Sequence, residues 1–288
     1  MQFKPPLKAS PAHIFSPKRF RISSLFTAAS LLAGCLASSP MNPSVSQPVE
    51  QLNETHVVQQ SNGWEQLAPG LERRYYRPDS SFGLTSFAAL RIDPNNFYFR
   101  VHYSPGSSQT ISQWRTQLQG AAGFINANFF DEHDSVVGLL VSDNISYGAS
   151  FMGFGGMFQV APDGFTRIRS LIYEPYQGEP LQQASQAFPM LIVNGEPTYE
   201  RTEGDRASRR TLIGQDSAGR IILMVTNGLF GMRLADLSAY LYSTDLDLRA
   251  ALNLDGGGST MLSLTAGDSI TIPSFDAVPA VIAFYPRS

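Results

Sequence analysis

The feature that most constrains this chain is a run of three glycines between a carboxylate and two hydroxyl residues, Asp255-Gly256-Gly257-Gly258-Ser259-Thr260. It follows an apolar segment over 250–254 that is typical of a strand. Glycine loses the most conformational entropy on folding and adds no side chain to a core, so three in a row need a reason. The reason is either a tight turn or a ligand that touches the backbone amides. The run alone leaves both open.

The overall composition is that of a globular protein large enough for a sizeable core, with 43% hydrophobic residues over 288 positions. Its charge is unevenly placed. All lysines lie within the first 18 residues, followed by Arg19 and Arg21, whereas the first acidic residue is Glu50. The rest of the chain is therefore more acidic than the net charge of −3 indicates. This distribution argues against nucleic acid as a partner.

The N-terminal segment has the pattern of a secretory signal peptide. A basic flank precedes an apolar run over 22–34 that is too short to span a bilayer comfortably. The run ends in Leu-Ala-Gly-Cys, which resembles a bacterial lipobox, so we expect residues 1–34 to be removed and Cys35 to be lipidated. The alternative is an ordinary signal peptide with an incidental cysteine. We therefore expect a lipid-anchored protein of the bacterial cell envelope, at the outer membrane if the cell has two membranes.

The remainder divides into a tether and one domain. Residues 35–62 are rich in Ser, Pro, Gln and Asn and predict a flexible tether. Many short apolar segments separated by turn signals, such as Pro162-Asp163-Gly164, predict strands over 63–288. Helical spacing is found near 110–118 and 234–241. We expect a monomeric, single α+β domain around a mixed, mostly antiparallel β-sheet with a few helices.

Several chemistries lack the residues that they need. No two of the four histidines have the spacing of helical zinc ligands, and Cys35 is the only cysteine. The segment 131–134 contains three acids that could bind calcium, although a solvated turn is the alternative. A P-loop is excluded because no lysine follows residue 18, and Ser259 lacks a G-x-S-x-G elbow. We expect no cofactor, with a divalent cation such as calcium left open.

Polar side chains gather where three apolar segments end. They are Asn126, Asn128 and Asp131, then Arg209 and Arg210, and finally Asn253 and Asp255. Each group has a structural alternative: asparagine as a turn residue, arginine in a surface ion pair with Glu203 or Asp205, and aspartate as a cap. Together they would supply arginines for an anion and carboxylates at one edge of the sheet.

Four stretches in this order resemble blocks of the phosphodiester glycosidase family: Asn-Ala-Asn-Phe-Phe-Asp at 126–131, Phe-Pro-Met-Leu-Ile-Val-Asn-Gly at 188–195, Arg-Thr-Leu-Ile-Gly-Gln-Asp at 210–216, and Asn-Leu-Asp-Gly-Gly-Gly-Ser at 253–259. The resemblance covers about 84–285. It departs from the family pattern at Asn128, where glycine is frequent, and at Leu212, where alanine is found. Both departures concern the shape of the pocket more than the reaction.

The resemblance implies hydrolysis of the sugar C1–O bond of a sugar-1-phosphodiester, which releases a sugar and a phosphomonoester. Glycosidases commonly use two carboxylates. Asp255 would be nucleophile or base, Asp131 the second carboxylate, and Glu203 or Asp205 a replacement for Asp131. Arg210 would hold the phosphate through paired N–H groups. The expected substrate contacts are Asn126, Asn128, Arg209, Asn253, Gly256, Gly257, Gly258 and Ser259. Asn126 and Asn253 would hold sugar hydroxyls or orient the acids.

The expected substrate is a phosphorylated glycan of the cell envelope or an exopolysaccharide. Two other functions remain open at this point. One is a catalytically silent envelope lipoprotein that binds phosphorylated glycans with the same arginine and glycine run. The other is a purely structural lipoprotein, which leaves the glycines beside Asp255 without an explanation.

Overall fold

The structure is a computed structural model that describes residues 63–78, 84–200 and 202–287. The predicted signal peptide (1–34), the predicted lipidation site at Cys35 and the predicted tether (35–62) lie outside the described residues. Within the described ranges no helix has the length and apolar character that a membrane crossing requires.

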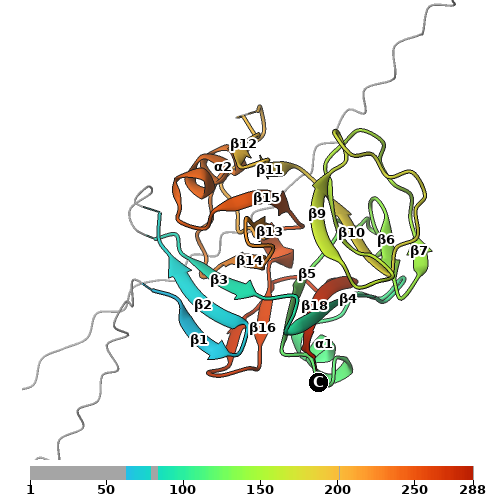
Figure 1. Ribbon diagram of the computed structural model, residues 1–288, viewed down its shortest axis with the longest axis horizontal. Helices are drawn as coiled ribbons and strands as arrows, with labels where there is room; N and C mark the ends of the chain where they lie inside the picture. Colours follow the sequence, from blue (N-terminus) through green and yellow to red (C-terminus); the bar gives the residue numbers. More distant parts are fainter. Residues whose placement is uncertain (1–62, 79–83, 201, 288) are drawn as a thin grey trace, which may run out of the picture. The chain divides into compact units, whose positions relative to one another are not determined.

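The described chain is mostly β-structure, folded into three sheets with two α-helices (Figure 1). The largest sheet has eight strands in the order β1-β2-β3-β14-β13-β15-β11-β12. In chain order they are β1 (Glu65–Ala68), β2 (Leu71–Tyr76), β3 (Phe87–Ile92), β11 (Met190–Val193), β12 (Glu196–Pro197), β13 (Thr211–Asp216), β14 (Ile221–Thr226) and β15 (Leu248–Asn253).

Two smaller sheets have five strands each. The first has the order β7-β6-β10-β8-β9 and consists of β6 (Leu140–Ser142), β7 (Ile145–Tyr147), β8 (Gly156–Val160), β9 (Thr166–Ser170) and β10 (Gln183–Ala187). The second has the order β17-β16-β5-β18-β4 and consists of β4 (Phe97–Tyr103), β5 (Gly123–Asn126), β16 (Leu262–Leu264), β17 (Ile270–Ile272) and β18 (Ala280–Pro286).

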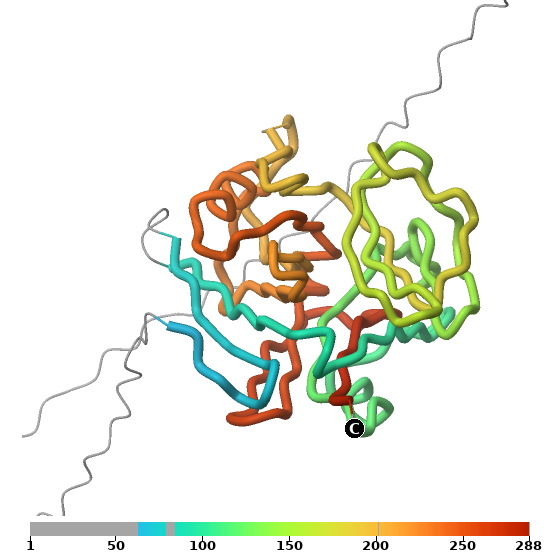
Figure 2. The backbone as a smooth tube through the Cα atoms, viewed as in Figure 1, coloured from blue at the N-terminus to red at the C-terminus, as the bar shows by residue number. Residues whose placement is uncertain are grey.

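The sheet arrangement corrects the expectation of one mixed sheet. All strand pairs in the described ranges are antiparallel. Short turns favour this pairing, since a parallel pair needs a crossover of about a dozen residues or more. The predicted turn at Pro162-Asp163-Gly164, for example, joins β8 to β9. The tube in Figure 2 shows the chain leaving the eight-stranded sheet and the sheet of β4 and β18 and later returning to both, whereas β6 to β10 follow one another in a single sheet.

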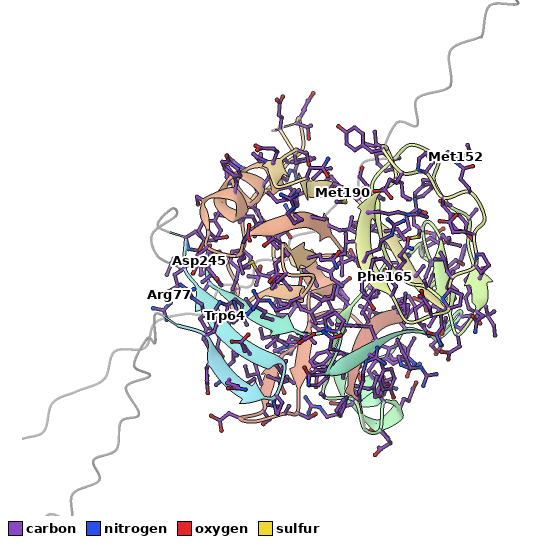
Figure 3. All side chains as sticks on the ribbon, viewed as in Figure 1. Trp64, Arg77, Met152, Phe165, Met190 and Asp245 are labelled. Carbon is purple, nitrogen blue, oxygen red and sulfur yellow. The ribbon has the colours of Figure 1, made fainter. Side chains whose placement is uncertain are left out.

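The three sheets share one hydrophobic core. Leu90 and Leu252 come from the eight-stranded sheet, Phe158 from the β8 sheet, and Phe99 and Phe284 from the β18 sheet. The rings of Phe99 and Phe158 meet edge to face with centroids 5.6 Å apart, which joins the two smaller sheets. In Figure 3, Met190 lies between the eight-stranded sheet and the sheet that contains β9 and β10. The core therefore fixes how the strand ends of all three sheets meet.

The two helices form where the apolar spacing predicts them. The first, α1 (Ile111–Gln117), begins at a capping box between Thr110 and Gln113 and buries Trp114. The second, α2 (Leu234–Ser243), buries Leu237 and Leu241 in a cluster with residues of the eight-stranded sheet. Figure 1 shows α2 beside β11 and β15. Its position is important for the site because its first turn reaches the pocket described below.

The ends of β5 and β15 are held beside the start of β13. Leu212 of β13 pairs with Asn253, and the amide of Leu254 donates to the carbonyl of Thr211 at 2.9 Å. The amide of Asp255 donates to the carbonyl of Ala127, just after β5, at 3.1 Å. Three segments distant in the sequence therefore converge at Asp255.

Candidate active site

A pocket with a volume of about 500 Å³ opens where these strand ends converge. Its lining comes from the segments that follow β5 and β15, the loop before β8, the connection between β10 and β11, the segment before β13, and the first residue of α2. The lining residues are Phe129, Phe154, Phe188, Pro189, Tyr199, Ser208, Arg210, Leu234, Asn253, Asp255, Gly256 and Gly257. The pocket brings together Asp255, Arg210 and Asn253 from the sequence-predicted set.

Asp255 is the carboxylate of this pocket. Burial raises the pKa of Asp255 above its ordinary value, the Ser259 hydroxyl and the Gly256 amide oppose that rise, and nearby Asp276 adds to it. The Gly256 amide donates to Oδ1 of Asp255 at 2.8 Å. A carboxyl group in this environment holds its proton to a higher pH than an exposed aspartate, which makes its ionised form a stronger proton acceptor.

Asn126 holds the backbone of Asp255 in place. Its Nδ2 donates to the carbonyl oxygen of Asp255 at 2.6 Å, and its Oδ1 accepts from Thr211 Oγ1 at 2.8 Å and from the amide of Met261 at 3.1 Å. The side chain is buried and does not line the pocket. Of the two roles expected for Asn126, a contact with a sugar hydroxyl or orientation of an acid, these bonds favour the second.

Arg210 is the cation of the pocket. Its Nε donates to the carbonyl of Met232 at 2.9 Å and its Nη2 to the carbonyl of Arg206 at 2.6 Å. Asp205 Oδ1 lies 3.7 Å from Nη2, and burial lowers the pKa of the guanidinium while Asp205 opposes that change. Of the five N–H groups of arginine, these bonds use two, so the others are available to an anion within the described site. The carbonyls fix the guanidinium before any ligand arrives.

Arg209 points away from the pocket, although it is the neighbour of Arg210. Its Nη2 donates to the carbonyl of Pro273 at 3.0 Å, and its guanidinium lies 4.8 Å from the ring centroid of Phe275. The side chain is buried, and burial lowers the pKa of this guanidinium. Arg209 does not line the pocket, its Nε and Nη1 have no hydrogen-bond partner within the described residues, and its expected substrate contact stays a prediction.

Backbone conformation and packing require two of the three glycines. Gly257 has a φ of 64°, and a side chain at Gly256 would come within 2.8 Å of the carbonyl oxygen of Arg209. The amide of Gly256 donates to Asp255, and the amide of Gly257 donates to the carbonyl of Arg209 at 2.8 Å. These two amides are therefore occupied, and the expected phosphate contact stays a prediction for the amide of Gly258.

Asn128 and Asp131 lie outside the pocket lining. Asn128 is buried and donates to the carbonyls of Leu139 and Gln186 at 3.1 and 3.0 Å, while its Oδ1 accepts from Ser185. Asp131 is exposed, and the amides of Ser135 and His133 lower its pKa by donating to Oδ1. Asn128 therefore links the segment after β5 to β10 by hydrogen bonds, and Asp131 caps a turn.

The two alternative carboxylates also lie outside the lining. Asp205 accepts from the amides of Leu234 and Ala235 at 2.9 and 3.0 Å, so it caps the N-terminus of α2. Glu203 is exposed. Among the described residues, Asp255 is the one carboxylate that lines this pocket. No group of three or more His, Cys, Asp or Glu side chains with metal-site geometry occurs in the described part of the chain.

An aromatic wall faces the polar residues and was not predicted from the sequence. The rings of Phe129 and Phe188 stack with centroids 4.5 Å apart, and Phe154 lies 4.9 Å from Phe188. Phe129 and Phe188 lie within stretches that resemble the family blocks, so the sequence contained a signal that could have identified them as site residues. Tyr199 and Ser208 have no such signal.

Asn253 donates from Nδ2 to the carbonyl of Phe188 at 3.0 Å, and its buried Oδ1 has no hydrogen bond within the described residues.

The fold and the site define a β-sheet protein whose pocket contains a partly buried carboxylate, a guanidinium held by backbone carbonyls and an aromatic wall. Such a pocket suits an anionic substrate with an apolar face. The chain belongs to the phosphodiester glycosidase family, whose family model matches residues 119–285.

Solved structures show the same fold. The catalytic domain of zebrafish N-acetylglucosamine-1-phosphodiester alpha-N-acetylglucosaminidase has 22% sequence identity and a TM-score of 0.59, over 76% of this chain and 85% of that chain. A hypothetical protein from Synechocystis has 16% identity and a TM-score of 0.54, over 76% and 62% of the two chains. A putative exported protein from Burkholderia pseudomallei has 14% identity and a TM-score of 0.54, over 70% and 74%. No curated protein matches the chain.

Proposed function

We propose that this protein hydrolyses sugar-1-phosphodiesters at the sugar C1–O bond and releases a sugar and a phosphomonoester. The observation that carries the proposal is the presence of Asp255 and Arg210 in one pocket. Membership of the phosphodiester glycosidase family supports it. The name of the zebrafish protein makes N-acetylglucosamine the first sugar to try.

In the proposed reaction, Asp255 accepts a proton from a water molecule whose oxygen attacks C1. The C1–O bond breaks, and its electron pair leaves with the phosphate oxygen. Arg210 faces the negative charge that develops on that oxygen, and an arginine held in advance is well suited to this task. A phosphate leaving group needs little help from a general acid, so one carboxylate is sufficient.

The role of base follows from the number of carboxylates in the pocket. A double-displacement mechanism needs a nucleophile and a second group to activate water, and glycosidases normally use two carboxyl groups for this. Asp255 is the one carboxylate in the lining among the described residues, and Asp276 lies close enough to raise its pKa. We propose that Asp255 is the base of a single displacement with inversion at C1, and retention of configuration in the released sugar would contradict this assignment.

We further propose that Arg210 supplies the positive charge of the reaction and that no metal cofactor is needed. A chelator such as EDTA should leave the rate unchanged, and loss of activity that calcium restores would contradict this proposal.

We also propose that the substrate is a glycan or glycolipid of the bacterial cell envelope or an exopolysaccharide, reached by a protein anchored through lipidated Cys35. The sequence pattern before Cys35 supports this location. The test is the mass of the mature N-terminus. Acyl groups on Cys35 are expected, and an unmodified cysteine recovered from the soluble fraction would contradict the anchor.

The experiment for the function is an assay of reducing sugar released from an aryl N-acetylglucosamine-1-phosphodiester by the full chain. Asp255→Asn and Arg210→Ala should each abolish release, while Asp131→Asn should retain it. A second candidate function is a module that only binds phosphorylated glycans, which the fixed, partly unoccupied Arg210 would also permit. Tight binding of the diester without any release over a panel of sugars would favour the module.

A further inference from the structure

Ser208 lies in the short segment that carries Arg210 to the edge of the eight-stranded sheet. Segment 208–210 leads into β13, and the glycine run follows β15. These two strands are antiparallel neighbours, so the start of β13 lies beside the end of β15 (Figure 1). The amide of Gly257 donates to the carbonyl of Arg209 at 2.8 Å. Segment 208–210 therefore packs directly on the glycine run.

The side chains of Ser208 and Arg210 are on one side of this segment. Residues two apart in an extended chain point the same way, and these two line the pocket, whereas Arg209 between them does not. A side chain built at Gly257 would lie 3.4 Å from the hydroxyl oxygen of Ser208. The hydroxyl therefore belongs to the same wall of the pocket as Arg210 and lies against the run that begins at Asp255.

One backbone carbonyl fixes both residues. The carbonyl oxygen of Met232 accepts from the amide of Ser208 at 3.3 Å and from Nε of Arg210 at 2.9 Å. The amide of Met232 donates back to the carbonyl of Ser208 at 3.0 Å. A side chain at Gly231 would collide with that carbonyl of Ser208, so this close approach needs glycine. The hydroxyl and the guanidinium are therefore held in a fixed relation to each other.

The hydroxyl of Ser208 is a hydrogen-bond donor that the protein does not use. It makes no hydrogen bond with the described residues, although the side chain is partly buried. A hydroxyl can donate one hydrogen bond, and a donor that shares a wall with a guanidinium favours a negatively charged acceptor. A nonbridging oxygen of a phosphate is such an acceptor.

We propose that Ser208 is a second phosphate contact, whose hydroxyl donates a hydrogen bond to a nonbridging oxygen of the substrate while Arg210 binds the same phosphate. This inference rests on the proposed hydrolysis. The phosphate of the diester carries one negative charge, and it gains a second when the C1–O bond breaks. The hydrogen bond therefore strengthens in the transition state and raises kcat as well as binding the substrate.

The experiment measures release of reducing sugar from an aryl N-acetylglucosamine-1-phosphodiester by the full chain. Ser208→Ala should lower kcat/KM by about tenfold or more, mainly through kcat, because a hydrogen bond to a charged group is lost. Ser208→Thr keeps the hydroxyl and should retain most of the rate. The matched control is Ser146→Ala, at an exposed serine of β7 outside the pocket lining, and it should leave both constants unchanged.

Sulfur substitution separates a phosphate contact from a structural role of Ser208. The same diester is prepared with sulfur at either nonbridging position, and both diastereomers are compared with the oxygen diester in the wild type and in Ser208→Ala. Because sulfur is a weak acceptor, the oxygen-to-sulfur rate ratio of the more sensitive diastereomer should fall at least about fivefold in the variant. A structural role would slow all three substrates equally, and an unchanged ratio would overturn the inference.

The two proposals fail differently. Calorimetry on the same proteins measures binding of an N-acetylglucosaminyl phosphonate, in which a methylene group replaces the oxygen on C1 and prevents cleavage. If the wild type releases no sugar from the diester, the hydrolysis is refuted, and weaker phosphonate binding by Ser208→Ala would still support the contact. If the wild type releases sugar and Asp255→Asn does not, while Ser208→Ala matches the wild type in rate and binding, only the contact of Ser208 is refuted.

Discussion

Asp131 and Asp255 both follow a buried strand of the same protein, yet their surroundings differ in every respect that matters for chemistry. Asp131 is exposed, and the amides of Ser135 and His133 lower its pKa. Asp255 is partly buried in a pocket with Arg210, and burial raises its pKa. The comparison teaches that a carboxylate after a buried strand is not by itself a catalytic group. Its burial and its neighbours determine its role.

The largest expected effect separates these two aspartates. Asp255→Asn should lower kcat by about 10³-fold or more, because it removes the proposed base. Asp131→Asn should change kcat by less than about twofold, because this side chain caps a turn outside the pocket. The measurement is steady-state release of reducing sugar, with circular dichroism as the check on folding. Equal losses in the two variants would remove the distinction.

A second pair extends the comparison to the adjacent arginines. Arg210→Lys should lower kcat/KM by about 10²-fold. A lysine ammonium group cannot donate to both carbonyls that now fix the guanidinium and also present paired N–H groups to the phosphate. Arg209→Lys should lower the melting temperature and leave kcat/KM nearly unchanged, because Arg209 contacts Pro273 and Phe275 and does not line the pocket. Thermal unfolding and kinetics of both proteins decide the matter. A larger kinetic loss for Arg209→Lys would reverse the assignment.

A third pair concerns the two asparagines that follow β5. Asn126→Ala should lower kcat by about tenfold and shift the pH dependence of the rate, because Asn126 positions the backbone of Asp255. Asn128→Ala should cost about 1–3 kcal/mol of stability, since it removes bonds to two buried carbonyls and the acceptor of the buried Ser185 hydroxyl. The kcat of the folded Asn128 variant should be normal. Unchanged kinetics in Asn126→Ala would remove its positioning role.

The smallest expected effect is the dependence of stability on pH. Because the pKa of Asp255 is raised in the folded state, its protonated form contributes stability at acidic pH, and this contribution is lost as pH rises through the folded pKa. Asp255→Asn should therefore melt a few degrees above the wild type at neutral pH, with the difference shrinking at acidic pH. Asp131→Asn should show the opposite sign, since the pKa of Asp131 is lowered. Melting curves across pH test both signs.

Local structure was largely predictable from the sequence, and strand pairing was not. The spacing of Ile111, Trp114 and Leu118 and that of Leu234, Leu237 and Leu241 predicted both helices. The turn signals predicted hairpins such as β8 to β9. Which strands would share a sheet depends on contacts between segments distant in the sequence, and the division into three antiparallel sheets was missed for that reason.

The sequence predicted only part of the site, because side-chain directions and hydrogen-bond partners also depend on the fold. Asp255, Arg210 and Asn253 do line one pocket. Adjacent residues of an extended segment face opposite sides, so Arg209 and Arg210 could not both point the same way. The spacing does not say which of them faces the pocket. The donors of Asn126 and Asn128 and the amides of Gly256 and Gly257 are used within the protein, and only the folded structure shows these bonds.

The central claim is that the protein cleaves the sugar C1–O bond with Asp255 as base. Hydrolysis in water labelled with oxygen-18, followed by mass spectrometry of both products, tests it directly. Attack at C1 places the label in the released sugar and leaves the phosphomonoester unlabelled, and Asp255→Asn should give neither product. Label in the phosphomonoester would show attack at phosphorus and would contradict the proposed reaction.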